Sequence, residues 1–149
     1  MDYVATEIGR VRKPQDGTAF IEIPEKYWDA TLQLSEFSHM IVLWWITGRD
    51  TAKDRSNLKN SPRGRDAPVS GVFASRSPAR PTPIGVSIVA IVEIDPQAKR
   101  IAIDQIDARD DTPVVDIKPY MPFSDKVDGA RVPTWFRDNV PRYTQRPLD

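Results

Sequence analysis

The chain lacks cysteine entirely and has one histidine, His39, among its 149 residues. The absence of cysteine excludes disulfides, thiolate zinc sites, iron–sulfur clusters and a cysteine nucleophile. A single histidine leaves little room for a histidine-based relay, and we expect no metal site. His39 stands at the entry to an apolar run, where a hydrogen-bonded structural histidine is more common than a catalytic one.

Long apolar segments and an excess charge of either sign are also missing. The longest apolar run, Met40 to Ile46, is far too short to cross a bilayer, and the N-terminus lacks a signal-peptide pattern. The 21 basic and 21 acidic side chains cancel, so nothing global indicates nucleic acid or an anionic membrane as a partner. We expect a cytoplasmic protein forming a single domain over residues 1–149, with its core at about 4–122.

No glycine-rich phosphate loop of the GxGxxG or Walker type is present, and no serine or cysteine relay is visible. An enzyme with so few reactive side chains is suited to group transfer from an activated cofactor. In such a reaction the cofactor carries the electrophile, while the protein supplies position and electrostatics.

The pattern of apolar residues indicates a mainly β protein. The 14 prolines argue against a helical bundle. Residues from Pro24 to about Leu34 are expected to form a short helix, with Tyr27, Ala30, Thr31 and Leu34 on one face. Alternating or continuous apolar patterns predict strands at residues 8–12, 18–23, 40–46, 84–94, 100–106 and 112–117. The fold class that follows is a small closed or strongly curved β-barrel with little helix.

Two segments lie outside this predicted core. Residues 48–70 are polar and should form a long loop, either a lid or binding segment or simply disordered. From Arg49 to Arg65 this loop has six basic residues and two acidic ones. The excess of positive charge could bind an anionic substrate, although a solvated run of charges is the more common explanation. Residues 123–149 are rich in proline and arginine and are expected to form an arm on the surface or on a partner.

The most informative stretch is Gly71–Ser87. It carries Arg76 and Arg80 in a loop that three prolines stiffen. Because a guanidinium group fits a carboxylate or phosphate at two points, the loop has the features of a pre-organised anion clamp. The alternative, a proline-rich surface loop with solvated arginines, is equally consistent with the segment alone.

Carboxylates supply the other candidate site residues. One strand end has four aspartates close together in the sequence, Asp104, Asp107, Asp110 and Asp111. They could bind a metal, act as paired carboxylates or form turns. Turn formation is preferred for Asp110 and Asp111. Asp116, Lys118 and Tyr120 alternate along an extended segment and should share a face. This catalytic candidate set could orient a substrate amine or hydroxyl, with Asp116 as proton acceptor; a surface ion pair is the alternative.

Several of these segments together resemble the TsaA-like (YaeB/TrmO) family. The resembling segments are Ile8-Gly9, Phe37-Ser38-His39 with the apolar run after it, Gly71–Ser87 and Thr112–Tyr120, in the family's order, over about residues 7–122. The resemblance implies a small β-barrel that dimerises and binds S-adenosylmethionine close to the dimer interface. The best-known members methylate the threonylcarbamoyl-modified adenosine next to the tRNA anticodon.

The resemblance also implies which residues bind the cofactor. The two arginines would hold the methionyl carboxylate, Val86 would lie against the cofactor, and a strand end would border the adenosine part. The implied cofactor-binding residues are Thr47, Gly48, Arg76, Arg80, Val86, Asp104, Gln105, Ile106 and Asp107.

The chain departs from the family's pattern at several places. Thr82 stands where the family usually has Asn, and Thr47-Gly48 replace a His-Gln pair. A Pro-Arg-Gln segment near the N-terminus is missing, because Pro14 to Gly17 forms only a short turn. The larger tRNA-modifying members have an additional C-terminal domain, whereas this chain has only a short tail. The cofactor is therefore better supported than the tRNA substrate.

The sequence thus predicts a homodimeric S-adenosylmethionine-dependent methyltransferase. Its acceptor would be modified adenosine in tRNA, through N6-methylation, or another small or nucleobase molecule. A protein that binds S-adenosylmethionine or a nucleoside without catalysis is the alternative. An RNA-binding barrel without cofactor is a third interpretation, against which the neutral net charge argues.

Overall fold

The computed structural model describes residues 1–61, 67–137 and 144. The chain divides into two compact units. The sheet unit comprises residues 1–46, 84–120 and 143–149, and the loop unit comprises residues 47–83 and 121–142. The length of the chain predicts a single domain, and its division into two compact units is a finding of the structure.

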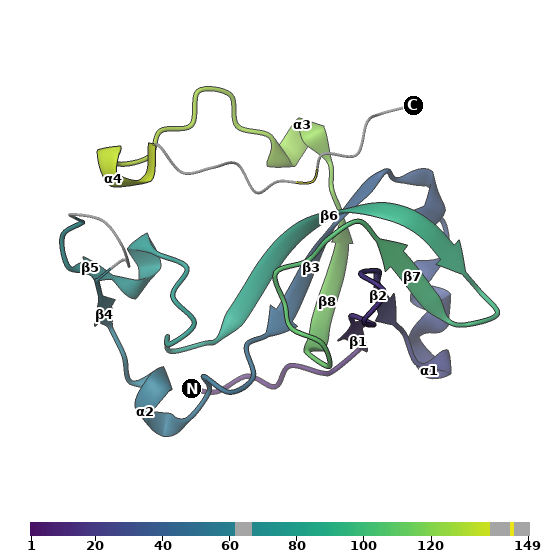
Figure 1. Ribbon diagram of the computed structural model, residues 1–149, viewed down its shortest axis with the longest axis horizontal. Coiled ribbons are helices and arrows are strands. Elements are labelled where there is room, and N and C mark those ends of the chain that lie inside the picture. The colour runs from purple at the N-terminus through teal and green to yellow at the C-terminus, as the bar shows by residue number, and fades with distance from the viewer. Residues whose placement is uncertain (62–66, 138–143, 145–149) are drawn as a thin grey trace. The chain divides into compact units, whose positions relative to one another are not determined.

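The sheet unit is built on six antiparallel strands, paired in the order β1-β2-β7-β6-β3-β8. Their bounds are β1 (Gly9–Arg12), β2 (Ala19–Glu22), β3 (His39–Trp45), β6 (Ile84–Asp95), β7 (Arg100–Ile103) and β8 (Pro113–Pro119). β8 pairs again with β1, so strand pairing runs round all six strands. Figure 1 shows the strong curvature of this sheet, along which the long strand β6 bends. The prediction of a mainly β, strongly curved sheet is confirmed.

The core lies on the concave side of the sheet and follows from the alternating apolar pattern. Val11, Ile21, Met40, Val42, Val89, Ile101 and Val114 are all 0% exposed. They come from all six strands, most of which bury one face and leave the other toward solvent, whereas β6 buries both faces around Ala90. Removing this apolar surface from water is the main favourable contribution to folding of the unit.

The connection between β2 and β3 differs from the predicted helix. It consists of α1 (Glu25–Trp28) and two 3-10 turns, η1 (Asp29–Thr31) and η2 (Leu34–Glu36). The prediction of one helix from Pro24 to Leu34 is wrong. Leu32 is extended (φ −55°, ψ 127°) and Gln33 is left-handed (φ 68°), and these two residues interrupt the helical hydrogen bonding.

The loop unit contains only short elements. They are α2 (Ala52–Arg55), β4 (Lys59–Asn60), β5 (Ser70–Gly71), η3 (Val72–Ala74), α3 (Pro122–Asp125) and α4 (Thr134–Arg137). The segment predicted as a loop at residues 48–70 includes α2 and β4, and residues 62–66 lie outside the described part of the chain. The helical turn α4 lies within the segment predicted as an arm at residues 123–149.

The arm predicted at residues 123–149 begins within α3, and its residues 138–143 and 145–149 are not among those described. Within the described residues, no helix is both long enough and apolar enough to cross a membrane.

Candidate functional site

Three neighbouring strands place several predicted site residues on one face. The register sets Val86 of β6 and Asp116 of β8 on either side of Leu43 of β3. Lys118 lies opposite Ile41 in the same way, and the Tyr120 N–H donates to the His39 carbonyl (3.1 Å). Because buried Met40 and Val42 point to the core, these alternate positions form the opposite side, the outer face of β6-β3-β8.

The two charged residues of the outer face form an ion pair. The Lys118 ammonium lies 2.8 Å from the Asp116 carboxylate, as their spacing predicts. Asp116 also accepts a hydrogen bond from the Ile117 N–H (3.0 Å). The hydrogen bond to Asp116 raises the pKa of Lys118. Both side chains are substantially exposed, so the outer face presents a fixed cation beside an anion.

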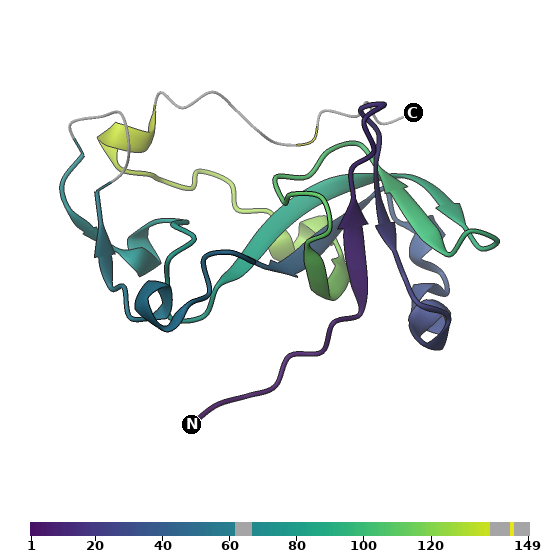
Figure 2. The ribbon, with the colours of Figure 1, turned by 60° about the horizontal axis from the view of Figure 1, so that its bottom comes forward.

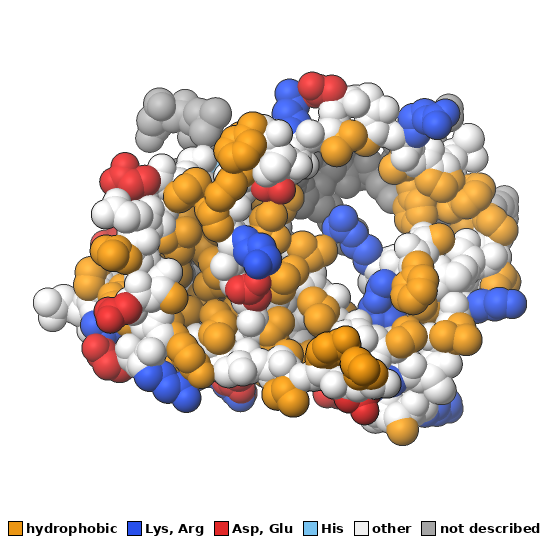
Figure 3. Space-filling view, turned by 180° about the vertical axis from the view of Figure 1, so that it is seen from behind, with side chains coloured by type: hydrophobic (Ala, Val, Ile, Leu, Met, Phe, Trp, Pro, Cys, Tyr) orange, Lys and Arg blue, Asp and Glu red, His pale blue; other side chains and the backbone are white. Residues whose placement is uncertain are grey.

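Apolar side chains surround this ion pair. On β6, Ile84, Val86 and Ile88 are 38%, 40% and 45% exposed. Ile41 and Leu43 of β3 add half-buried apolar surface between β6 and β8. Hydrophobic side chains gather over much of the molecular face that Figure 3 shows. A contiguous exposed apolar area on a sheet is typical of an interaction or ligand surface.

The glycine of the Pro-Ile-Gly run has a packing role. A Cβ atom at Gly85 would overlap the indole ring of Trp44, its cross-strand neighbour. The ring is fixed there because the Trp44 Nε1–H donates to the Ser87 hydroxyl (3.1 Å). Gly85 therefore allows Trp44 to lie flat across β6, on the side opposite to Val86.

The strand-end residues after β7 divide into two kinds. The Asp104 carboxylate accepts from the Ala90 N–H (2.8 Å) and from the Thr144 hydroxyl, so it ties the strand end to β6. Ile106 is 7% exposed and belongs to the core. Gln105 and Asp107 are exposed. Of the four predicted cofactor-binding residues here, these two present free side chains.

The loop that follows is held by contacts from β1 and the turn after it. Lys13 Nζ donates to the carbonyls of Ile106 (2.7 Å) and Ala108 (2.9 Å). The Lys13 N–H donates to Asp110 (2.7 Å). Asp111, with φ 66°, pairs with Arg10 and Arg12, and the hydrogen bond from Arg10 lowers the pKa of Asp111. The structure therefore supports turn and tethering roles for Asp110 and Asp111.

The loop unit carries the two arginines, and they differ. Arg80 Nη1 donates to the carbonyls of Ser75 (3.0 Å) and Ser77 (3.4 Å) and is half-buried. Arg76 is exposed, and its guanidinium has no partner among the described residues. Arg80 thus stiffens the loop from within, whereas Arg76 is presented to solvent with its donors free.

Other contacts within the loop unit hold the same loop. The Asn57 side-chain amide donates to the Ala79 carbonyl (3.0 Å), and Arg55 Nε donates to the Pro81 carbonyl (3.0 Å). Thr47 and Gly48, also predicted to bind the cofactor, are exposed in this unit. Gly48 has φ 78°, a left-handed conformation that favours glycine.

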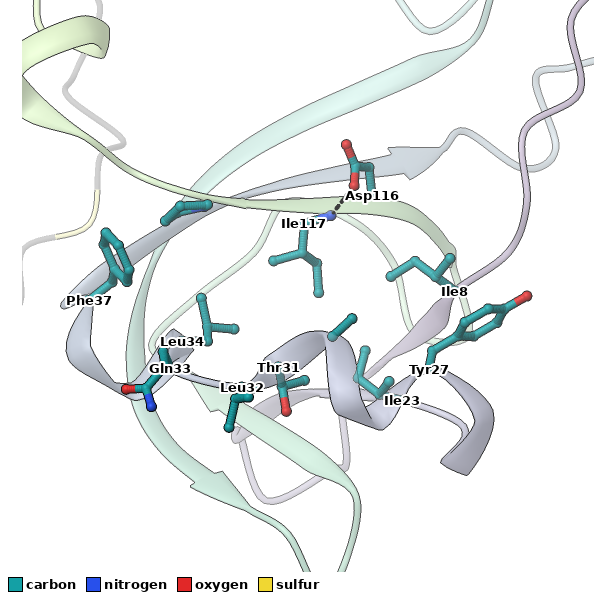
Figure 4. A pocket seen from close by; sticks show the side chains of 12 residues that line it. Ile8, Ile23, Tyr27, Thr31, Leu32, Gln33, Leu34, Phe37, Asp116 and Ile117 are labelled. Atoms are coloured by element: carbon teal, nitrogen blue, oxygen red, sulfur yellow. Dashed lines mark hydrogen bonds between the residues drawn. The ribbon is translucent and has the colours of Figure 1, made fainter.

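A cavity in the sheet unit was not predicted from the sequence. It has a volume of about 270 Å³ and lies between β8 and the α1–η2 connection (Figure 4). Its lining residues are Ile8, Ile23, Tyr27, Ala30, Thr31, Leu32, Gln33, Leu34, Phe37, Asp116, Ile117 and Pro119. The shared helical face of Tyr27, Ala30, Thr31 and Leu34 was visible in the sequence, but that spacing does not reveal that the face borders a cavity.

Known proteins share both the sequence and the fold. A probable S-adenosyl-L-methionine-binding protein of Methanocaldococcus jannaschii is 38% identical over 131 residues, covering 87% of this chain and 99% of that protein. The tRNA (adenine(37)-N6)-methyltransferase of Escherichia coli is 34% identical over 120 residues, covering 79% of this chain. A crystal structure of TrmO matches 89% of this chain with a TM-score of 0.68 and 29% identity.

The chain is shorter than several of these relatives. It spans 51% of the Escherichia coli enzyme, 64% of the TrmO chain and 32% of a probable S-adenosyl-L-methionine-binding protein of Archaeoglobus fulgidus. The family model of the tRNA-methyltransferase O N-terminal domain matches residues 9–126, which include all the strands of the sheet unit. The chain therefore belongs to the family of tRNA-methyltransferase O N-terminal domains.

Proposed function

We propose that the chain is an S-adenosylmethionine-dependent methyltransferase that acts in the cytoplasm on an adenosine of tRNA. The observation that carries this proposal is membership of the family over residues 9–126. The name of the Escherichia coli relative supports methylation at adenine N6 as the reaction. Because the chain covers about half of that enzyme, another small or nucleobase acceptor is retained as a second possible substrate.

The side chains present suit this cofactor. The unpaired Arg76 guanidinium offers two-point binding to an amino-acid carboxylate. The exposed Gln105 and Asp107 offer polar groups for ribose hydroxyls or an adenine amine, and exposed Val86 offers an apolar contact. We assign supporting roles to the remaining predicted cofactor-binding residues, which are Thr47, Gly48, Arg80, Asp104 and Ile106.

We assign the catalytic work to Asp116, Lys118 and Tyr120. Bound S-adenosylmethionine would supply an electrophilic methyl group for an acceptor nitrogen, and S-adenosylhomocysteine would be the leaving group, its sulfur keeping the electron pair of the broken bond. Asp116 accepts the proton that the acceptor nitrogen loses. Lys118, 2.8 Å from Asp116, holds that carboxylate in place, and Tyr120 lies two residues further along the same face.

We further propose that the ring of strand pairs works as a small barrel that forms a homodimer. The exposed apolar residues Ile84, Val86 and Ile88 support this, because such surface on a sheet is commonly covered by a partner. The proline-rich arm at residues 123–149 is a second candidate for contact with the partner copy.

A non-catalytic S-adenosylmethionine-binding protein is the second candidate function. Thr47-Gly48 stand in place of the family's His-Gln pair, and several archaeal relatives are named only as binding proteins. This function requires the cofactor site but no acceptor.

Calorimetry followed by a transfer assay separates the candidates. The protein is titrated with S-adenosylmethionine and with S-adenosylhomocysteine, and then incubated with labelled S-adenosylmethionine and either tRNA or free nucleosides. Saturable binding with methyl transfer that Asp116→Asn reduces supports the enzyme. Binding without transfer to any acceptor supports the second function. Absence of binding to the folded protein overturns both.

A further inference from the structure

One edge of β8 is free, and the cavity lies beside it. β1 pairs with β8 only through Gly9–Val114 and Arg10–Pro113. From residue 115 to 119, β8 has β3 on one side, and among the described residues no strand on the other. The cavity occupies that second side, between β8 and the α1–η2 connection (Figure 4).

The backbone at this edge is held by a neighbouring side chain. Hydrogen bonding alternates along an antiparallel strand, and the Tyr120 N–H donates to β3. The Ile117 N–H, three residues earlier, therefore faces the free edge. Its acceptor is the carboxylate of the preceding residue, Asp116, at 3.0 Å. Free edges of this kind accept a further strand.

The chemistry of the cavity restricts what can fill it. In Figure 4, Ile8, Leu34 and Ile117 point into the cavity, whereas the Asp116 carboxylate points away from it. No lysine or arginine lines it. An anionic ligand would find no counter-charge, so the cavity suits an uncharged, apolar and extended occupant.

The segment before β1 supplies apolar side chains for such an occupant, although Asp2 and Glu7 are charged, and it lies next to the cavity along the chain. Met1, Tyr3 and Val4 are 105%, 87% and 97% exposed. Figure 2 shows the segment leaving β1 toward the label N, away from the sheet. The next residue to be ordered against β8 is Ile8, whose N–H donates to the Val114 carbonyl (2.8 Å) and whose side chain lines the cavity.

We propose that residues 1–7 dock onto the free edge of β8 as an extension of β1 and fill the cavity. Continuing the Gly9–Val114 register residue by residue sets Thr6 opposite Ile117 and Val4 opposite Pro119. The distance is short, because four extended residues span about 13 Å. Val4 then enters the apolar cavity in place of solvent.

The same register also sets the neighbours on the outer face. Ala5 lies opposite Lys118 and Tyr3 opposite Tyr120. Glu7 falls opposite Asp116, where its carboxylate meets Lys118 on the diagonal and keeps Arg10 as its ion-pair partner (2.6 Å). The added strand also offers a backbone carbonyl to the Ile117 N–H. Docking therefore replaces Asp116 as the partner of this amide and frees one oxygen of the Asp116 carboxylate.

Disulfide trapping tests the register, since the protein has no cysteine of its own. In Ala5→Cys with Lys118→Cys, the two thiols face each other, within the Cα separation of about 4.4–6.8 Å that a disulfide spans. The matched control is Thr6→Cys with Lys118→Cys, in which the thiols point to opposite faces. We expect the first pair to close within one chain at least tenfold faster during mild oxidation. Equal rates, or a disulfide between two chains, overturn the proposal.

Hydrogen exchange provides a second readout. In the unmodified full-length protein, the amides of Ala5 to Glu7 should exchange at least tenfold more slowly than in Val4→Asp, which places a charge in the cavity. Tyr3→Asp is the matched control, because its side chain faces outward and it should keep the protection. Amides that exchange at the unstructured rate in the unmodified protein overturn the proposal.

Discussion

At the residue scale, the two arginines of the proline-containing loop Gly71–Ser87 make different contacts. Arg80 donates to the carbonyls of Ser75 and Ser77 and shapes the loop. Arg76 is exposed, and its donors have no acceptor in the described part of the chain. Because a guanidinium that already satisfies backbone carbonyls has fewer donors to offer, Arg76 is the stronger candidate for contact with an anionic ligand group.

Arg76→Ala should therefore weaken S-adenosylmethionine binding by at least about 1.5 kcal/mol, as for the loss of a charged hydrogen bond. Its unfolding temperature should stay unchanged. Arg80→Ala should lower both affinity and thermal stability, because two loop carbonyls lose their donor. Calorimetric titration and thermal melts of both variants measure these effects. An unchanged affinity in folded Arg76→Ala would remove this residue from the site.

Asp111 should make folding stability depend on acid pH. The hydrogen bond from Arg10 lowers the pKa of Asp111 below its ordinary value in the folded state. A lowered folded pKa means that the stabilisation is present above the unfolded pKa and is lost as the pH falls through the folded pKa. The stability difference between the unmodified protein and Asp111→Asn should thus shrink as pH falls from 7 toward 2. Urea unfolding at several pH values measures it, and a constant difference would contradict the assignment.

The sequence could predict which charged side chains share a face, but not which candidate site residues are buried or already hydrogen-bonded. The spacing of Asp116 and Lys118 predicted a shared face, and the structure confirms it. The distinction between Arg76 and Arg80, or between buried Ile106 and exposed Asp107, depends on where loop carbonyls and core side chains lie. That information arises only in the folded chain.

At the scale of elements, the pairing of β3 with β6 depends on a glycine. Gly85 leaves room for the indole of Trp44, which donates to Ser87. Gly85→Ala should destabilise the protein by about 1–3 kcal/mol, as expected for overpacking. In Gly71→Ala the new Cβ would lie 3.8 Å from the Leu58 carbonyl oxygen, an ordinary contact, so this control should be close to neutral.

Urea unfolding of both glycine variants measures this difference. Equal stabilities would show that Trp44 can move aside without cost.

The strands followed from alternating apolar patterns and, for β3 and β6, from nearly continuous apolar runs, because burial of one or both faces of a strand imposes these patterns. The connection after β2 did not follow the helical pattern. Its apolar spacing fits a helix, yet Gln33 adopts φ 68° and divides the segment. A left-handed glutamine carries no sequence signal comparable to glycine, so the interruption and the cavity beside it were unpredictable.

At the scale of the whole molecule, the outer face of β6-β3-β8 exposes apolar side chains that a monomer would leave in contact with water. Ile88→Asp should shift the proposed dimer to monomer, because it puts an unpaired charge into the apolar surface. Leu32→Asp, at an exposed residue of the α1–η2 connection, is the control and should leave the assembly unchanged. Light scattering at micromolar concentration measures both, and a monomeric unmodified protein would contradict the dimer.

The fold class followed from the sequence because strand patterns, proline content and turn residues all agree. The turn predicted at Pro14–Gly17 is confirmed, with the Gly17 N–H donating to the Pro14 carbonyl, and two amides donate to the Asp95 carboxylate in the turn after β6. The change from the apolar run Met40–Ile46 to the polar segment at residues 48–70 marks the first boundary between the two compact units, but nothing in the sequence shows that residues 47–83 and 121–142 form one unit.

The pairing of β1 with β8 has a consequence for how the chain reaches its native state. Gly9 pairs with Val114, so the first and last strands of the sheet must find each other across nearly the whole described sheet unit. Non-local pairing of this kind slows folding. On the ribosome, β1 and β2 can form early, but the ring cannot close until β8 has emerged. Synthesis past Pro119 is therefore the event that commits the chain to its native topology.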